Sequence, residues 1–268
     1  MSQPTTDALQ FAGSGRPLST AGFAAVCDDL GVGAPEIWAV LSVETGGFGF
    51  LADRRPQILF ERHVFHRLTQ GRFDATHPDI SNTNPGGYAG RGAEYGRLEL
   101  AVGLDRGAAL QSASWGIGQI MGFTFAGAGF GSIGEMVDTM VGGEDAQLMA
   151  MGRLIADQGW GESLRRRDWA AFARGYNGEA YALNAYDTRL AAAYAGYRVA
   201  RPDLSLRAAQ AGLLFLGIDP GPVDGMLGRR TRGAVMVFQE RNRLPITGNP
   251  DPETAEEIMA SAFGAWSG

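Results

Sequence analysis

Apolar residues recur every three or four positions through most of the first two hundred residues, which is the spacing of one helical face. The clearest helix lies between two boundary signals. Pro35 suits a first helical turn, and Gly46-Gly47 suits a helix end. We therefore predict a helix over residues 35–45. Its apolar stripe includes an acidic residue, because the positions that share this face are Ile37, Val40, Leu41 and Glu44.

Other segments have comparable helical patterns, and most are bounded by capping residues or glycines. Residues 57–65 read as extended and then helical, whereas 69–92 form a long loop whose Asn, Tyr and Gly residues suit sugar binding. The remaining helical patterns cover residues 20–30, 95–102, 133–140, 146–155, 169–173 and 182–197.

A second, shorter pattern follows a boundary at Arg201-Pro202-Asp203. Helices are predicted over residues 204–216, 229–241 and 252–259, with a turn-rich stretch at 217–225. The fold class is therefore mainly α. An irregular lead-in over residues 1–18 is followed by a larger domain over 19–200 and a small three-helix domain over 203–262.

Composition restricts the partners. The 268 residues have a mean hydropathy of -0.10 and no apolar run of 18 residues, so membrane insertion is not expected. Residues 1–15 lack a secretory signal, which predicts synthesis in a host cytoplasm. A net charge of -6 argues against nucleic acid as a partner.

Several kinds of chemistry have little support in this sequence. Cys27 is the single cysteine, and His63 and His66 are three residues apart but lack a third ligand, so we predict no metal site and no cofactor. A nucleophile elbow of the G-x-S-x-G kind is also missing from the sequence.

Glu44 is the first candidate for catalysis. Partial burial and the negative end of a helix dipole both disfavour its ionised form, so its pKa should be raised. A carboxylic acid that is still protonated near neutral pH is what general acid catalysis of glycoside cleavage requires. The structural alternative is an amphipathic helix that ends in a glutamate paired with an arginine.

Two later stretches give this glutamate a context. Residues 114–121 read Ser-Trp-Gly-Ile-Gly-Gln-Ile-Met and include Ser114 and Gln119, and residues 174–178 include Tyr176 and Asn177. In this order the three stretches resemble the signature motifs of the lysozyme-like superfamily, in its goose-type lysozyme and lytic transglycosylase branch.

The match is closer to the N-acetylmuramidase domain of phage and prophage endolysins, and it covers about residues 19–198. The resemblance implies a lysozyme-like fold that cleaves the β-1,4 bond between N-acetylmuramic acid and N-acetylglucosamine in peptidoglycan. It also implies that Glu44 is the acid and that Gln119, Tyr176 and Asn177 line the cleft, with Ser114 as a further substrate-binding candidate.

The C-terminal module resembles the peptidoglycan-binding domain of many wall hydrolases. The residues that carry this resemblance include Gly217 to Gly225, Phe238-Gln239 and Thr247-Gly248. Peptidoglycan is therefore the expected partner. We expect a monomer that a phage holin or an injection device delivers to the wall.

The sequence leaves the identity of the second catalytic group undecided. A two-carboxylate hydrolase needs a partner for Glu44, and the candidates are Asp53, which could instead support a turn with Arg54 or Arg55, and Glu61, which could instead pair with Arg62. The transglycosylase branch uses a single glutamate and gives 1,6-anhydro products. A wall-binding structural protein without catalysis is a third alternative.

Overall fold

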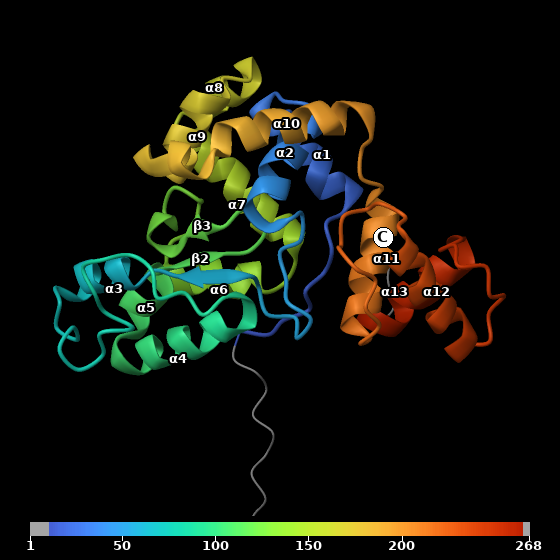
Figure 1. The fold of residues 1–268 in the computed structure, drawn as a ribbon, viewed down its shortest axis with the longest axis horizontal. Coiled ribbons are helices and arrows are strands. Elements are labelled where there is room, and N and C mark those ends of the chain that lie inside the picture. The colour runs from blue at the N-terminus through green and yellow to red at the C-terminus, as the bar shows by residue number, and fades with distance from the viewer. Residues whose placement is uncertain (1–10, 265–268) are drawn as a thin grey trace, which may run out of the picture.

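The computed structural model describes residues 11–264, and its helices form a larger N-terminal part and a smaller C-terminal unit beside it (Figure 1). Short 3₁₀ helices η1 (Arg91–Ala93), η2 (Gly122–Thr124) and η3 (Glu179–Asn184) lie between the α-helices. The α-helices of the larger part are α1 (Thr20–Leu30), α2 (Ala34–Thr45), α3 (Arg62–Thr69), α4 (Glu94–Leu104), α5 (Arg106–Gln111), α6 (Ile133–Met140), α7 (Glu144–Asp157), α8 (Gly161–Arg166), α9 (Trp169–Asn177) and α10 (Tyr186–Val199).

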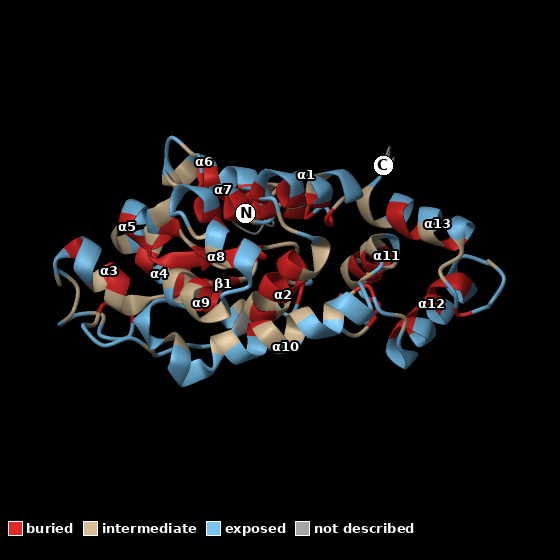
Figure 2. Ribbon diagram, turned by 90° about the horizontal axis from the view of Figure 1, so that it is seen from above, coloured by how far each residue is buried: buried red, intermediate tan, exposed pale blue. Residues whose placement is uncertain are grey.

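Helix α2 packs against α10 and α1 on the side of the larger part that faces the C-terminal unit, and Figure 2 shows its buried residues in red. Pro35 occupies its first turn, and Gly46 ends it in the left-handed conformation with φ of 71°. The predicted helix over 35–45 is thus confirmed. Ile37, Val40 and Leu41 are fully buried, so the stripe that includes Glu44 does face inward.

A small antiparallel sheet was not predicted from the sequence. Its strands β1 (Ile58–Phe60), β2 (Ala113–Trp115) and β3 (Ile120–Met121) are two or three residues long, too short to show an alternating pattern. Ile58 lies opposite Trp115, and Ser114 lies opposite Met121. The sheet therefore brings the segment after α2 next to the segment that contains Gln119.

Most predicted helices are present, but the helix expected over residues 182–197 is wrong at its start. Ala185 adopts a left-handed conformation with φ of 51°, which separates η3 from α10. The six-residue helices α5 and α8 were also missed, since they span fewer than two helical turns. Of the irregular lead-in expected over residues 1–18, residues 1–10 lie outside the described part of the chain.

The C-terminal unit contains the three helices expected there, α11 (Leu204–Phe215), α12 (Arg229–Arg241) and α13 (Pro252–Phe263), around a core that includes Leu213, Val235 and Ile258. Two buried glutamines hold its loops in the same way. The Gln210 side-chain oxygen accepts from the backbone N–H groups of 224 and 225, and that of Gln239 accepts from 247 and 248. Because the buried side-chain amides are hydrogen-bonded, they hold the loops in place without leaving buried polar atoms unpaired.

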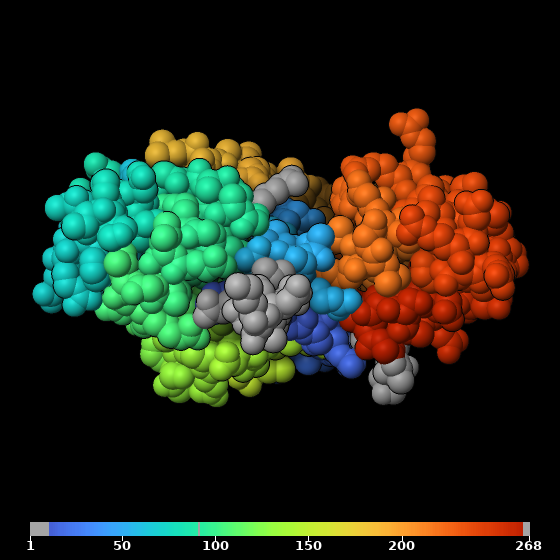
Figure 3. All heavy atoms as spheres, turned by 90° about the horizontal axis from the view of Figure 1, so that it is seen from below, coloured from blue at the N-terminus to red at the C-terminus, as the bar shows by residue number. Residues whose placement is uncertain are grey.

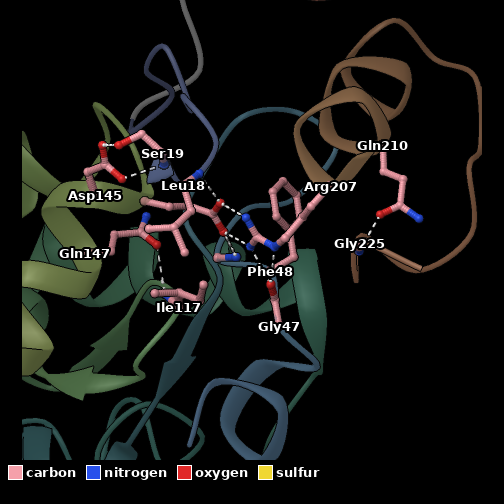
Figure 4. A network of polar contacts seen from close by, with 12 residues as sticks. Leu18, Ser19, Gly47, Phe48, Ile117, Asp145, Gln147, Arg207, Gln210 and Gly225 are labelled. Atoms are coloured by element: carbon pink, nitrogen blue, oxygen red, sulfur yellow. Dashed lines mark hydrogen bonds and ion pairs between the residues drawn. The ribbon is translucent and has the colours of Figure 1, made fainter. Parts of the chain in front are cut away.

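The C-terminal unit packs directly against the larger part (Figure 3). At the centre of the contact, the fully buried Arg207 of α11 forms a two-pronged ion pair with the fully buried Glu144 of α7, both N–O distances being 2.6 Å (Figure 4). Arg207 also donates to the carbonyl of Gly47, three residues after Glu44. At the edge, the Arg54 guanidinium lies 4.4 Å from the Phe215 ring.

Candidate active site

Glu44 is in the last turn of α2 and is partly buried. One of its carboxyl oxygens accepts a hydrogen bond of 2.9 Å from the Asn177 side-chain amide, and no described residue forms an ion pair with it. Burial raises the pKa of Glu44 from 4.5 to about 7, although the hydrogen bond from Asn177 and the charge of Arg189 act in the opposite direction. The group can therefore carry a proton at neutral pH, as an acid catalyst must.

Helix α9 brings the Tyr-Asn pair to this glutamate. The Tyr176 ring stacks on Phe172 with centroids 5.4 Å apart, and its hydroxyl donates to the Gly118 carbonyl at 2.5 Å. Burial raises the pKa of Tyr176 well above 10, with a smaller contribution from Glu44, so the hydroxyl stays a neutral donor. The buried amide oxygen of Asn177 has no hydrogen-bond partner among the described residues. It is thus an enclosed, unpaired acceptor on the side chain that donates to Glu44.

Gln119 is held between the strands. Its φ of 47° places it in the left-handed region, at the turn that joins β2 to β3. Its amide N–H groups donate to the carbonyls of Gln57 and Gly116, while its amide oxygen accepts from the Ser114 hydroxyl at 2.9 Å. Ser114 is buried beneath Gln119 and orients it, whereas Gln119 reaches the cavity wall.

A cavity of about 550 Å³ lies between α3, the β3–η2 segment, the α7–α8 junction and the end of α9. It therefore joins four segments that are separate in the sequence. Of the proposed site residues, Glu61, Gln119, Tyr176 and Asn177 line this cavity, whereas Glu44 and Ser114 do not. Glu44 is joined to the cavity wall through its hydrogen bond with Asn177.

Glu61 faces the cavity from the start of α3. Tyr88 donates its hydroxyl to this carboxylate, at 3.0 and 3.1 Å from its two oxygens, and His63 Nδ1 lies 3.1 Å from one of them. The expected ion pair with Arg62 is not formed, because Arg62 donates instead to the carbonyls of Asn84 and Pro85. The loop over residues 69–92 thus contacts Glu61 through Tyr88, without lining the cavity itself.

Asp53 lies elsewhere. Its carboxylate accepts from the backbone and side-chain N–H groups of Arg55, with a closest N–O distance of 2.7 Å, and Arg55 in turn stacks on the Tyr95 ring. Asp53 does not line the cavity. Its observed contacts are those of a residue that supports a turn.

The segment after Glu44 is held by groups that the sequence did not indicate. Glu144 accepts from the Gly49 N–H at 2.9 Å, and Gln147 accepts from the Ile117 N–H at 2.8 Å. The approach at Gly49 is close, since an added Cβ would lie 2.1 Å from the Gln147 amide oxygen. Thr45 donates to the Ile117 carbonyl. No local signal could reveal these partners, since Thr45 and Ile117 are 72 residues apart and Gly49 and Glu144 are 95 residues apart.

The described part of the chain shows neither a cluster of three potential metal ligands nor a helix with the length and apolar character to span a bilayer. The site is therefore one of carboxyl, amide and aromatic groups around a cavity. This is the class of site that a glycoside hydrolase uses, with a protonated carboxyl beside hydrogen-bonding groups for a sugar.

Comparisons with known proteins specify the class. The family model for N-acetylmuramidase matches residues 33–198, and the model for a peptidoglycan binding domain matches residues 203–258. The crystal structure of the Burkholderia AP3 phage endolysin is similar, with 41% identity, a TM-score of 0.63 and coverage of 69% of this chain and 72% of that chain. A comparison with curated protein sequences found no significant match.

The N-acetylmuramidase model covers more than half of the chain, so the chain belongs to the N-acetylmuramidase family. It is a glycoside hydrolase of muramidase type that carries a C-terminal peptidoglycan-binding domain, and peptidoglycan is its partner.

Proposed function

We propose that this protein is an endolysin whose Glu44 protonates the glycosidic oxygen between N-acetylmuramic acid and N-acetylglucosamine, and that water then completes hydrolysis. The observation that carries the proposal is the partly buried Glu44 carboxyl, with a pKa of about 7, hydrogen-bonded to Asn177 beside the cavity. The similarity to a phage endolysin supports action within a lysis pathway.

The neighbouring residues receive roles from their contacts. The Asn177 side-chain amide holds the Glu44 carboxyl in place. Gln119, held by Ser114, retains one lone pair on its amide oxygen that can accept a hydrogen bond from the sugar. Tyr176 closes the cavity beside Glu44. We also propose that the domains divide between residues 200 and 203, and that the enzyme acts as a monomer without nucleic acid or membrane insertion.

The product decides between hydrolysis and transglycosylation, because both routes use Glu44 as the proton donor. We expect mass spectrometry of digested peptidoglycan to show muropeptides with ordinary reducing ends. A transglycosylase would instead release 1,6-anhydro muropeptides, each lighter by one water. Predominance of the anhydro products would overturn the hydrolytic assignment and leave Glu44 as the sole acid and base.

The second carboxylate is tested by a matched pair of variants. We propose that Glu61, which faces the cavity, orients the attacking water, and that Asp53 supports its turn through Arg55. Glu61→Gln should lower kcat about 100-fold, within the range of a general base, and Asp53→Asn should change it by less than about threefold. The reverse ranking would assign the role to Asp53. Equal, small effects would favour the single-glutamate route.

A further inference from the structure

Arg67 lines the cavity from helix α3 and has no acidic partner within residues 11–264. Helix α3 turns His63, Val64 and Arg67 toward the cavity, as positions i, i+1 and i+4 of one face. The Arg67 guanidinium lies 5.3 Å from the centroid of the Phe123 ring, and Phe123 itself is 40% exposed on the same wall. This ring is the contact that the structure records for Arg67.

The neighbouring arginines, unlike Arg67, use their guanidinium N–H groups in contacts within the protein. Arg62 donates to two loop carbonyls, and Arg72 pairs with Asp105 at 3.2 Å while lying over the Phe73 ring. The guanidinium of Arg67 retains a charge and a planar set of N–H donors that match a carboxylate. Stacking on an aromatic face restricts the side chain without using those donors.

The charges along the cavity favour one kind of ligand at this position. Glu61 precedes Arg67 by six residues, which corresponds to about 9 Å along a helix axis. An anionic substituent is repelled near Glu61 and attracted near Arg67. Of the two sugars that alternate in peptidoglycan, only muramic acid carries a lactyl group, whose carboxyl is either free or joined to a stem peptide with carboxylates of its own.

We propose that Arg67 and Phe123 form a subsite for a carboxylate carried by the muramic acid unit, on its lactyl group or on its stem peptide. The proposal rests on the function proposed above. It adds a residue that distinguishes muramic acid from glucosamine by charge and leaves the chemistry at Glu44 unchanged.

The test compares Arg67→Gln with wild-type enzyme on three soluble substrates: stem-bearing glycan strands, strands stripped of stems by an amidase, and stripped strands whose carboxylates are converted to methyl amides. Arg72→Gln is the matched control, since Arg72 also lies over a ring but pairs with Asp105 and does not line the cavity. We expect Arg67→Gln to raise KM about tenfold on carboxylate-bearing strands, with kcat little changed. Neutral strands should show no difference between the two enzymes.

The substrate arms identify the source of the carboxylate. A loss confined to stripped strands assigns the lactyl group, a loss confined to stem-bearing strands assigns the stem peptide, and a loss on both shows that the subsite accepts either carboxylate. An unchanged KM on both, or an equal loss on neutral strands, would overturn the proposal while cleavage itself continued. If wild-type enzyme cleaves none of the three substrates, the proposed function fails instead, so the two failures are distinguishable.

Discussion

Glu44→Gln is expected to lower the rate of peptidoglycan cleavage by about 1,000-fold, because the amide has no proton to give to the leaving oxygen. The variant should keep its fold and its wall binding, since Gln has the shape of Glu and the C-terminal domain is unaltered. Turbidity loss of wall suspensions and pelleting with insoluble peptidoglycan measure the two properties. Glu99→Gln, at an exposed site of the same domain, is the control and should remain active.

The same substitution should also stabilise the protein at high pH. The pKa of Glu44 is raised in the folded state, from 4.5 to about 7, so its ionisation destabilises the fold progressively as pH rises between these values. A neutral Gln removes this cost. We expect urea unfolding to show a gain of up to about 3 kcal/mol at pH 8 and almost none at pH 4.

Wild-type activity should fall through pH 7 for the same reason, as the acid loses its proton. An active Glu44→Gln enzyme would remove the assignment of Glu44 as the acid. A stability gain that did not vary between pH 4 and pH 8 would contradict the raised pKa.

Arg207→Met is expected to lower the free energy of unfolding by about 3–5 kcal/mol. Both Arg207 and Glu144 are fully buried, so the substitution leaves the Glu144 carboxylate without its counter-charge. The double variant Arg207→Met/Glu144→Gln should recover part of the loss, because the amide is uncharged and can still accept from the Gly49 N–H. Urea unfolding of the full chain measures these differences.

The ion pair should also affect catalysis. Arg207 and Glu144 hold Gly47 and Gly49, three and five residues after Glu44, so their loss is expected to lower kcat on a short soluble glycan by up to about 100-fold. Such a substrate removes any contribution from wall binding.

Arg54→Met is the matched control for this effect. It loosens the contact with Phe215 and Phe263 at the same domain interface but leaves the buried pair intact. We expect kcat close to wild type in this variant, measured well below its unfolding temperature. Equal kcat in Arg207→Met and wild type would show that the ion pair only joins the domains.

Interactions between residues that are close in sequence made much of the fold predictable from the sequence. The bounds of α2 follow from Pro35 and Gly46, and the stripe from Ile37 to Glu44 follows from helical spacing. The order of the three motifs was sufficient for the family. The bounds and the stripe of α2 depend on residues that are close in sequence, where capping, periodicity and glycine conformations act.

Only the tertiary structure placed the groups around Glu44. It put Glu61 on the cavity wall and Asp53 against Arg55, a distinction that two acidic residues in similar sequence contexts do not show. It also joined Arg207 to Glu144, 63 residues away. Buried charges find partners through the packing of whole helices, and local periodicity carries no information on which distant face a side chain will meet.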